Sequence, residues 1–550
     1  MTIAIWKEGP TEGYWFRNTS HFPTGISLHL WELFLPAHDA GTRRGFRRYG
    51  AAMDGCDFAR FKGRIYVRVC PVEDPEELAE RAKIAERALA VKLWRQDRAE
   101  WRIIKKSFRT RLMEFARQDP AGLSPDGLIH RLIGLRQIFV EGVIQHFAQQ
   151  PASMFAVGDW LRNTFDWTGV RASEALWALR NSASSSGESA DYSRAVARVA
   201  EALHADPNGS AIFHDEERAA VDRLEEIHVA APGVCNALEA FLYEYGDRLI
   251  TGFDLTDLTL RELPHLVVAA LSQREKVGTL SADAGRRCSD MGDEIRLRLP
   301  ADKRDAYEEG LREAQCAYGL NDEDVRTTYL WPLGLIRRSM LAAADHLVKS
   351  GKLEAPDDVF HTTPAELDAL LCGAVHPGPD ELARRAAEWR AWAADDPPAA
   401  FGEPQLPALG ALLSPECARV TSAIRFYREE VDARSERPRE GSWSVLVEGL
   451  AASPGRYEGQ ARVVRGPWDF ERVSQGDVLI ARTTSPAFNV ILPILGGVVT
   501  DRGGALCHAA IVAREFGIPA VVGTNSATTK IPDGAHVLVD GDHGFVTVRR

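Results

Sequence analysis

Hydrophobic positions recur at helical spacing through most of the first two thirds of the chain. Between Pro75 and about Gln118, residues such as Leu78, Ala85 and Leu89 form an apolar stripe among charged positions, which predicts one long helix or two. The same spacing predicts further helices at residues 125–150, 171–181, 190–205, 212–228, 234–247 and 263–274. Residues 1–72 are instead rich in aromatic and turn residues and predict an irregular segment with a little strand, at Gly63–Val67. We therefore expect residues 1–431 to form one mainly helical domain.

The pattern changes after a charged stretch with almost no apolar residue, residues 432–442, which is typical of an exposed linker. Beyond it, short β-like runs alternate with Gly and Pro turns. These runs are Ala461–Val464, Val478–Ala481, Gly497–Thr500, Ala520–Gly523, Val537–Asp540 and Phe545–Val548. The predicted fold class is multidomain α + α/β, with a large mainly α-helical domain followed by a small α/β domain at residues 443–550.

The composition argues against some kinds of binding partner. There are 78 acidic and 66 basic residues, and the net charge of −12 argues against a nucleic-acid surface and against binding to anionic membranes. The eight cysteines are scattered without a C-x-x-C pair, so neither a zinc site nor a disulfide framework is predicted, and we expect no metal site in this chain. Residues 1–10 lack the apolar core of a signal peptide, and the longest apolar run, Phe488–Thr500, is too short to span a bilayer. A cytoplasmic protein is expected.

The stretch Thr500–Pro519 carries the strongest chemical signal. An apolar run ends in the glycine pair Gly503–Gly504, and a helical pattern then begins at or next to His508 and stops at Gly517. At a helix N-terminus, unpaired amides and the positive end of the helix dipole favour an anion, and glycines let the backbone approach it. This arrangement predicts that His508 carries a phosphoryl group. The alternative is a polar histidine in a strand-to-helix turn.

The same segment resembles the phosphohistidine signature of the phosphoenolpyruvate-utilising enzymes. The matching positions are Thr500, Gly503, Gly504, His508, Ala510, Ile511, Ala513, Arg514, Glu515, Gly517, Pro519 and Gly523. The resemblance implies that residues 443–550 form a mobile, swivelling phosphohistidine domain and that the helical domain binds substrate. Near His508, we expect Arg502 and Arg514 to neutralise phosphoryl charge, Thr500 to offer a hydroxyl, and Gly503 and Gly504 to present backbone amides.

The helical region resembles the substrate domain of rifampin phosphotransferase-like and phenylphosphate synthase-like proteins. Tyr245-Gly246-Asp247-Arg248 stands where the former have Gly-His-Arg, so Asp247 replaces a histidine. Asp247 is the leading candidate for the base that activates an acceptor hydroxyl, with His265 second. Further candidates for holding the phosphoryl group are Arg248, Arg337 and Arg338. The alternatives are an ion pair of Asp247 or Arg248 with other helices, and a solvated helix face for Arg337 and Arg338.

The sequence contains neither a G-x-x-x-x-G-K-[ST] loop nor a stretch that reads as an ATP-grasp domain, and residues 73–430 lack the repeating strand–helix units of a (β/α)₈ barrel. The resemblance therefore implies a separate ATP-grasp-type subunit that binds Mg²⁺ with ATP and converts ATP to AMP and phosphate. The expected acceptor is a small molecule with a hydroxyl group, such as a phenol. Open alternatives are a rifampin-type antibiotic phosphotransferase component, a non-catalytic phosphocarrier or regulatory module, and a related fold used for another chemistry.

Overall fold

The computed structural model describes residues 3–6, 9–10, 12–18, 22, 25–179, 188–213, 220–274, 292–318, 324–394, 397–403, 413–431, 445–484, 488, 491–505 and 507–548. The chain forms two compact units. Unit 1 comprises Met1–Phe155, Asp247–Thr259 and Leu320–Ile424, and unit 2 comprises Ala156–Gly246, Leu260–Gly319 and Arg425–Arg550. Each unit is thus assembled from three separate stretches of sequence. The predicted linker, residues 432–442, lies outside the described residues.

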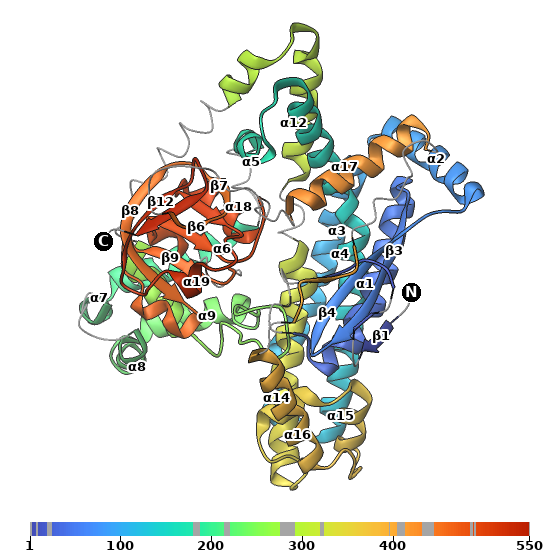
Figure 1. Ribbon diagram of the computed structural model, residues 1–550. Coiled ribbons are helices and arrows are strands. Elements are labelled where there is room, and N and C mark those ends of the chain that lie inside the picture. The colour runs from blue at the N-terminus through green and yellow to red at the C-terminus, as the bar shows by residue number, and fades with distance from the viewer. Residues whose placement is uncertain are drawn as a thin grey trace. The chain divides into compact units, whose positions relative to one another are not determined.

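Unit 1 begins with a five-stranded sheet in the order β1-β3-β4-β2-β5. Its strands are β1 (Ile3–Trp6), β2 (Trp15–Arg17), β3 (Met53–Phe61), β4 (Arg64–Pro71) and β5 (Ala400–Phe401). Only β1 and β3 pair in parallel. The helix α1 (Leu28–Tyr49) packs against β3, as Figure 1 shows in blue.

Residues 1–72 thus form four strands and a long helix, and not the mostly irregular segment that the sequence predicted; the strand expected at Gly63–Val67 lies largely within β4. Pro36, Gly41 and Gly45 interrupt the helical pattern of α1 in the sequence. In the structure, a Cβ on Gly41 or Gly45 would come within 3.0 Å of α4 backbone atoms. The two glycines therefore serve close packing between helices, which a residue pattern alone does not reveal.

The helices of unit 1 enclose its main apolar core. The predicted helical stretch at 75–118 is confirmed as two helices, α2 (Pro75–Ala90) and α3 (Leu93–Arg117). The other helical elements are η1 (Pro120–Gly122), the first part of α4 (Pro125–Thr168), η5 (Arg326–Leu330), α14 (Trp331–Lys349), η6 (Pro356–His361), α15 (Pro364–Leu371), α16 (Pro379–Ala394) and most of α17 (Pro415–Val431). Buried leucines of α4 and α14 meet in this core.

Unit 2 contains further helices, some of them predicted from the sequence and others, such as α12, not. They are the end of α4, α5 (Ala172–Ala175), η2 (Leu176–Leu179), α6 (Glu188–Ala205), α7 (Pro207–Phe213), α8 (Ala220–Ala230), α9 (Pro232–Tyr245), α10 (His265–Arg274), η4 (Ala301–Lys303) and α12 (Arg304–Ala317). α9 packs against α6 and α8. In the part of the chain that is described, no helix combines the length and the apolar character needed to cross a membrane.

The C-terminal part of unit 2 is an eight-stranded sheet in the order β6-β13-β12-β8-β9-β10-β11-β7. Its strands are β6 (Val445–Glu448), β7 (Leu450–Ser453), β8 (Arg456–Val464), β9 (Val478–Ala481), β10 (Gly497–Thr500), β11 (Ala520–Val522), β12 (His536–Asp540) and β13 (Phe545–Val548). Strands β8 to β11 run in parallel and include the fully buried β9, β10 and β11, as expected for parallel strands covered on both faces.

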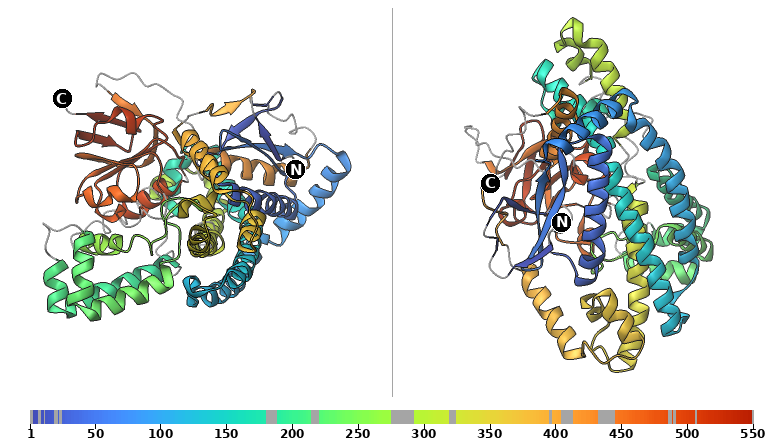
Figure 2. Two further views of the ribbon diagram at one scale, coloured as in Figure 1. Left: turned by 90° about the horizontal axis from the view of Figure 1, so that it is seen from below. Right: turned by 90° about the vertical axis from the view of Figure 1, so that its right-hand side faces the viewer.

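Short helical elements complete this domain: η8 (Pro467–Arg472), η10 (Leu492–Ile494), α18 (His508–Phe516) and α19 (Ala527–Lys530). Helix α18 contacts β7, β10 and β11, and Figure 2 shows these orange and red elements together from two sides. The predicted fold class, helical with a small α/β domain at the C-terminal end, is confirmed.

Candidate functional site

His508 is the first residue of α18, as the sequence predicted. The strand β10 ends at Thr500, a loop follows, and α18 runs from His508 to Phe516. The helix ends at Gly517, whose left-handed conformation (φ 69°) lets its amide bond back to the carbonyl groups of Ala513 and Arg514. The amides of the first turn of α18 and the positive end of its dipole are therefore next to the imidazole.

The loop before His508 needs the glycine at position 503. Gly503 has φ +126°, which favours glycine, and a Cβ there would come 2.6 Å from the Cys507 Sγ. Cys507 is the N-cap residue of α18, and its amide donates to the Gly504 carbonyl oxygen at 3.1 Å. Burial raises the pKa of the Cys507 thiol, opposed in part by the Ala510 amide and by the charge of Arg514. The thiol thus stays protonated and fills the space beside Gly503.

Thr484 is a residue of this site that sequence reasoning missed. It follows β9, its side chain is buried, and its Oγ1 lies 2.8 Å from the His508 Nδ1, a hydrogen-bond distance. The available signal was its position immediately before Ser485-Pro486, a dipeptide whose place matches the resembling family. This polar contact to Nδ1 distinguishes it from the Nε2 of the imidazole.

Asp501 holds the start of the loop that leads from β10 to His508. Its buried carboxylate accepts the Thr528 amide at 3.0 Å and the Thr528 hydroxyl, and its Oδ1 accepts the Thr524 hydroxyl at 3.3 Å. The predicted phosphate ligand Thr500 is fully buried, and its hydroxyl donates to the Arg502 carbonyl oxygen at 2.8 Å. Arg502 is half-buried and its Nη1 donates to the Asn525 Oδ1 at 3.1 Å. In this structure Thr500 stabilises the loop, whereas the Arg502 side chain is partly exposed.

Arg514 is in α18 but is only 3% exposed. Its guanidinium donates to the Ala452 carbonyl oxygen at 2.8 Å and to the Ala505 carbonyl oxygen. These contacts join the helix to β7 and to the loop that precedes His508. In this structure the side chain therefore braces the loop, and its predicted phosphate-binding role stays a prediction.

The acceptor-side candidates Asp247, Arg248, Arg337 and Arg338 all lie in unit 1. Asp247 is 2% exposed, and its Oδ2 accepts from the Arg338 Nη1 at 3.4 Å. Arg338 also donates to the Asp119 Oδ1 at 3.2 Å, and its side chain is 24% exposed. Of the four candidates, Asp247 and Arg338 are brought together, which matches the alternative of an ion pair between helices.

The other two arginines of this group pack against aromatic rings. The guanidinium carbon of Arg248 lies 5.1 Å from the Trp331 ring centroid, and that of Arg337 lies 4.7 Å from the Phe360 ring centroid. Arg337 is 4% exposed and donates to the Leu255 carbonyl oxygen at 2.7 Å. Arg337 therefore attaches the segment Asp247–Thr259 to α14, and its predicted phosphate-binding role stays a prediction.

His265, the second candidate base, is the first residue of α10 in unit 2 and is half-buried. Over the described ranges of the chain, no three His, Cys, Asp or Glu side chains converge in a way that could hold a metal ion. The described side chains thus offer no fit for a Mg²⁺ ion held by this chain alone.

Comparisons with known proteins agree with this geometry. Residues 473–544 match the family described as PEP-utilising enzyme, mobile domain, and residues 146–322 match the family described as rifampicin phosphotransferase fourth domain. The first match spans β9, Thr484, the glycine loop and α18. The resemblance found in the sequence is confirmed: residues 473–544 are similar to the mobile domain of the phosphoenolpyruvate-utilising enzymes.

Individual relatives include a probable phosphoenolpyruvate synthase of Archaeoglobus fulgidus, 41% identical over 24% of this chain and 17% of the relative. A rifampicin phosphotransferase of a Streptomyces species is 31% identical over 56% of this chain and 34% of the relative. An uncharacterised phosphotransferase of Bacillus subtilis is 26% identical over 62% of this chain and 40% of the relative. The chain thus spans well under half the length of each of these relatives.

Proposed function

We propose that this chain is the phosphocarrying and acceptor-binding part of an ATP-dependent phosphotransferase. His508 takes up a phosphoryl group from a nucleotide-binding partner and passes it to the hydroxyl group of a small aromatic acceptor such as a phenol. The observation that carries the proposal is the contact of the His508 Nδ1 with Thr484 at the N-terminus of α18, within the matched mobile domain.

The proposal assigns the Nε2 of His508 as the nucleophile. When Nδ1–H donates to the Thr484 hydroxyl, the neutral imidazole carries its lone pair on Nε2. A P–O bond of the donor breaks as the P–N bond to Nε2 forms, and the P–N bond breaks as the acceptor oxygen attacks. The acceptor's proton goes to a nearby base. Such transfers need positioning and charge neutralisation, which the amides of α18 and the half-buried Arg502 supply.

The acceptor side of the proposal rests on unit 1 and on the ordinary chemistry of phenols. A phenol has a pKa near 10, so a modest base within hydrogen-bond reach activates it. Asp247 remains the candidate base, with His265 as the second candidate. Arg338 is the candidate cation, because it is the more exposed partner of the ion pair with Asp247.

The donor side of the proposal is a separate ATP-grasp-type subunit. That subunit binds ATP with Mg²⁺ and releases AMP and phosphate as it charges His508. Mg²⁺ would neutralise the triphosphate on the partner. We base this division of labour on the sequence, in which no G-x-x-x-x-G-K-[ST] loop is found.

A second candidate is a component of a rifampin-type antibiotic phosphotransferase. The match of residues 146–322 and the Streptomyces rifampicin phosphotransferase relative favour it. The carrier chemistry at His508 is the same in both candidates, and the acceptor differs. A bulky antibiotic alcohol would then replace the phenol.

The test mixes the purified chain, a candidate ATP-grasp partner, Mg²⁺ and ATP labelled in the β-phosphate with a panel of phenols and rifampin. The expected result is acid-labile label on the chain, AMP in solution and label on one acceptor class. His508→Ala should abolish both labels. Label reaching an acceptor through the His508→Ala variant would overturn the carrier assignment, and turnover of ATP by the chain alone would overturn the division of labour.

A further inference from the structure

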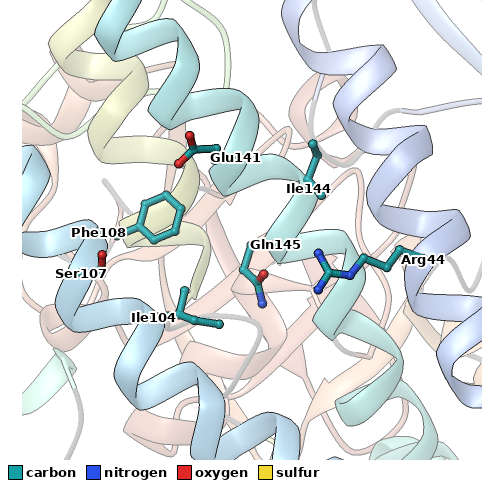
Figure 3. A pocket seen from close by; sticks show the side chains of 7 residues that line it. All are labelled: Arg44, Ile104, Ser107, Phe108, Glu141, Ile144 and Gln145. Carbon is teal, nitrogen blue, oxygen red and sulfur yellow. The ribbon is translucent and has the colours of Figure 1, made fainter.

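A pocket of about 340 Å³ lies within unit 1, on a surface that the phosphoryl-transfer residues do not use. It is formed by α1, α3 and α4. Its walls are Arg44 from α1, Ile104, Ser107 and Phe108 from α3, and Glu141, Ile144 and Gln145 from α4 (Figure 3). This volume is at the small end of ligand pockets, so it suits a compact molecule.

Two polar side chains, Arg44 and Gln145, line the pocket from α1 and α4. Figure 3 shows the Arg44 guanidinium directed toward Gln145 near the pocket centre. Within the described part of the chain, no hydrogen bond or ion pair occupies either side chain. A guanidinium is a planar fork of donors that matches a carboxylate, and the amide of a glutamine adds a further donor. The pair therefore fits a carboxylate group.

The rest of the pocket is mostly apolar. Ile104, Ile144 and the buried Phe108 form a hydrocarbon surface around this polar pair. The guanidinium carbon of Arg111 lies 5.6 Å from the Phe108 ring centroid, which fixes one side of the ring. A ligand with a flat or branched hydrocarbon body would bury that body here.

The charged residues that line the pocket indicate which charge the ligand carries. Glu141 accepts from the Arg111 Nη1 at 2.6 Å and from the Gln137 Nε2 at 3.0 Å, so its charge is compensated by a neighbouring arginine at the surface. This leaves Arg44 as the one uncompensated charge among the lining residues that the structure describes. Basic residues also outnumber acidic ones along α3, although the whole chain carries −12, and such a local positive region concentrates anions.

We propose that this pocket binds a small organic monocarboxylate with an apolar body, that is, an aromatic or branched aliphatic carboxylate. The carboxylate accepts from Arg44 and from the Gln145 amide group, and the hydrocarbon packs on Ile104, Ile144 and Phe108. Ser107 lies on the side of the pocket opposite Arg44 (Figure 3), where it can bond a second polar group of the ligand. The site is independent of phosphoryl transfer.

Calorimetric titration of the full chain with benzoate and with its neutral isostere benzamide tests the proposal. Benzoate should bind at one site, and benzamide about tenfold more weakly, because a charge-assisted hydrogen bond is roughly twice as strong as a neutral one. Arg44→Gln should weaken benzoate binding by about five- to tenfold and leave benzamide binding unchanged. Gln145→Ala should weaken benzoate binding by a smaller factor.

The matched control is Arg47→Gln, which removes an exposed arginine of the same helix that does not line the pocket. Equal weakening by Arg44→Gln and Arg47→Gln would mean diffuse attraction of anions and would overturn the site. Equal affinity for benzoate and benzamide, or no binding of benzoate up to about 10 mM, would also overturn it. His508→Ala should leave benzoate affinity unchanged. The benzoate titration therefore tests the pocket independently of the proposal that His508 carries a phosphoryl group.

Discussion

Replacing Thr484 with valine tests whether the hydroxyl next to His508 selects the reactive ring nitrogen. Valine has nearly the shape of threonine, and the Thr484 side chain is only 6% exposed, so the substitution fills the same space. The contact that disappears is the one between the Thr484 Oγ1 and the His508 Nδ1, 2.8 Å long. The perturbation is therefore confined to one polar interaction at His508.

The size of the effect follows from that single bond. A neutral hydrogen bond contributes a net 0.5–1.5 kcal/mol, so its loss should slow phosphorylation of His508 by about two- to tenfold. Without a partner on Nδ1, the imidazole proton distributes over both nitrogens, and part of the population no longer offers the Nε2 lone pair. The domain itself should lose no more than about 1.5 kcal/mol of unfolding free energy.

Two measurements check this prediction without any partner subunit. The first is the nitrogen chemical shifts of isotope-labelled His508, which report the Nδ1–H tautomer and should change to those of a mixture in Thr484→Val. The second is the rate at which phosphoramidate, a small chemical phosphoryl donor, phosphorylates His508. A merely structural role for Thr484 would alter stability without altering the tautomer.

The controls use hydroxyls of the same domain. Thr484→Ser should restore both the tautomer and the rate, because serine returns the hydroxyl. Thr529→Val removes an exposed hydroxyl that donates to the Ser526 carbonyl oxygen and should leave both readouts unchanged. An unchanged tautomer together with an unchanged rate in Thr484→Val would refute the reasoning.

Three further predictions concern residues of both units. Arg514→Met should lower the unfolding free energy of the C-terminal domain by about 2–4 kcal/mol, because two main-chain carbonyl groups lose a buried charged donor. Urea titrations measure this change. An unchanged midpoint of unfolding would contradict the bracing role. If Asp247 is the acceptor base, Asp247→Asn should reduce transfer to phenols at least about 100-fold while His508 remains chargeable, and full retention of transfer would remove Asp247 as the base. Burial lowers the pKa of His361 to about 4, below the ordinary value near 6.5, so the folded state binds fewer protons than the unfolded chain between these values. Unit 1 should thus lose stability as pH falls from about 6.5 to 4, and His361→Asn should flatten this dependence in urea titrations repeated across that range.

The C-terminal α/β domain was the most predictable part of the fold, because the sequence signals that define its elements are local. The bounds of β9, β10 and β13 are those that the alternation of apolar runs and turns predicted. The helix from His508 was predictable from the glycine pair before it and from Gly517 behind it. Each of these signals lies within a few residues of the element that it defines.

Long-range pairing was not predictable in the same way. β5, Ala400–Phe401, pairs with β2, which lies far earlier in the chain, and two residues carry too short a pattern to predict a strand. Thr484 lies 24 residues before His508, and its place before Ser485-Pro486 does not by itself indicate that its hydroxyl meets the imidazole. Contacts of this kind depend on how strands assemble in the sheet.

The predicted arginines show why a site cannot be completed from residue types alone. Guanidinium groups bind phosphate oxygens and main-chain carbonyl oxygens with the same donors. Arg514 reaches the carbonyl of a residue 62 positions away, and Arg337 reaches one 82 positions away, so each joins distant segments of the chain. Both are buried and engaged in this way, so residue type alone leaves their roles open between phosphate binding and bracing of the main chain.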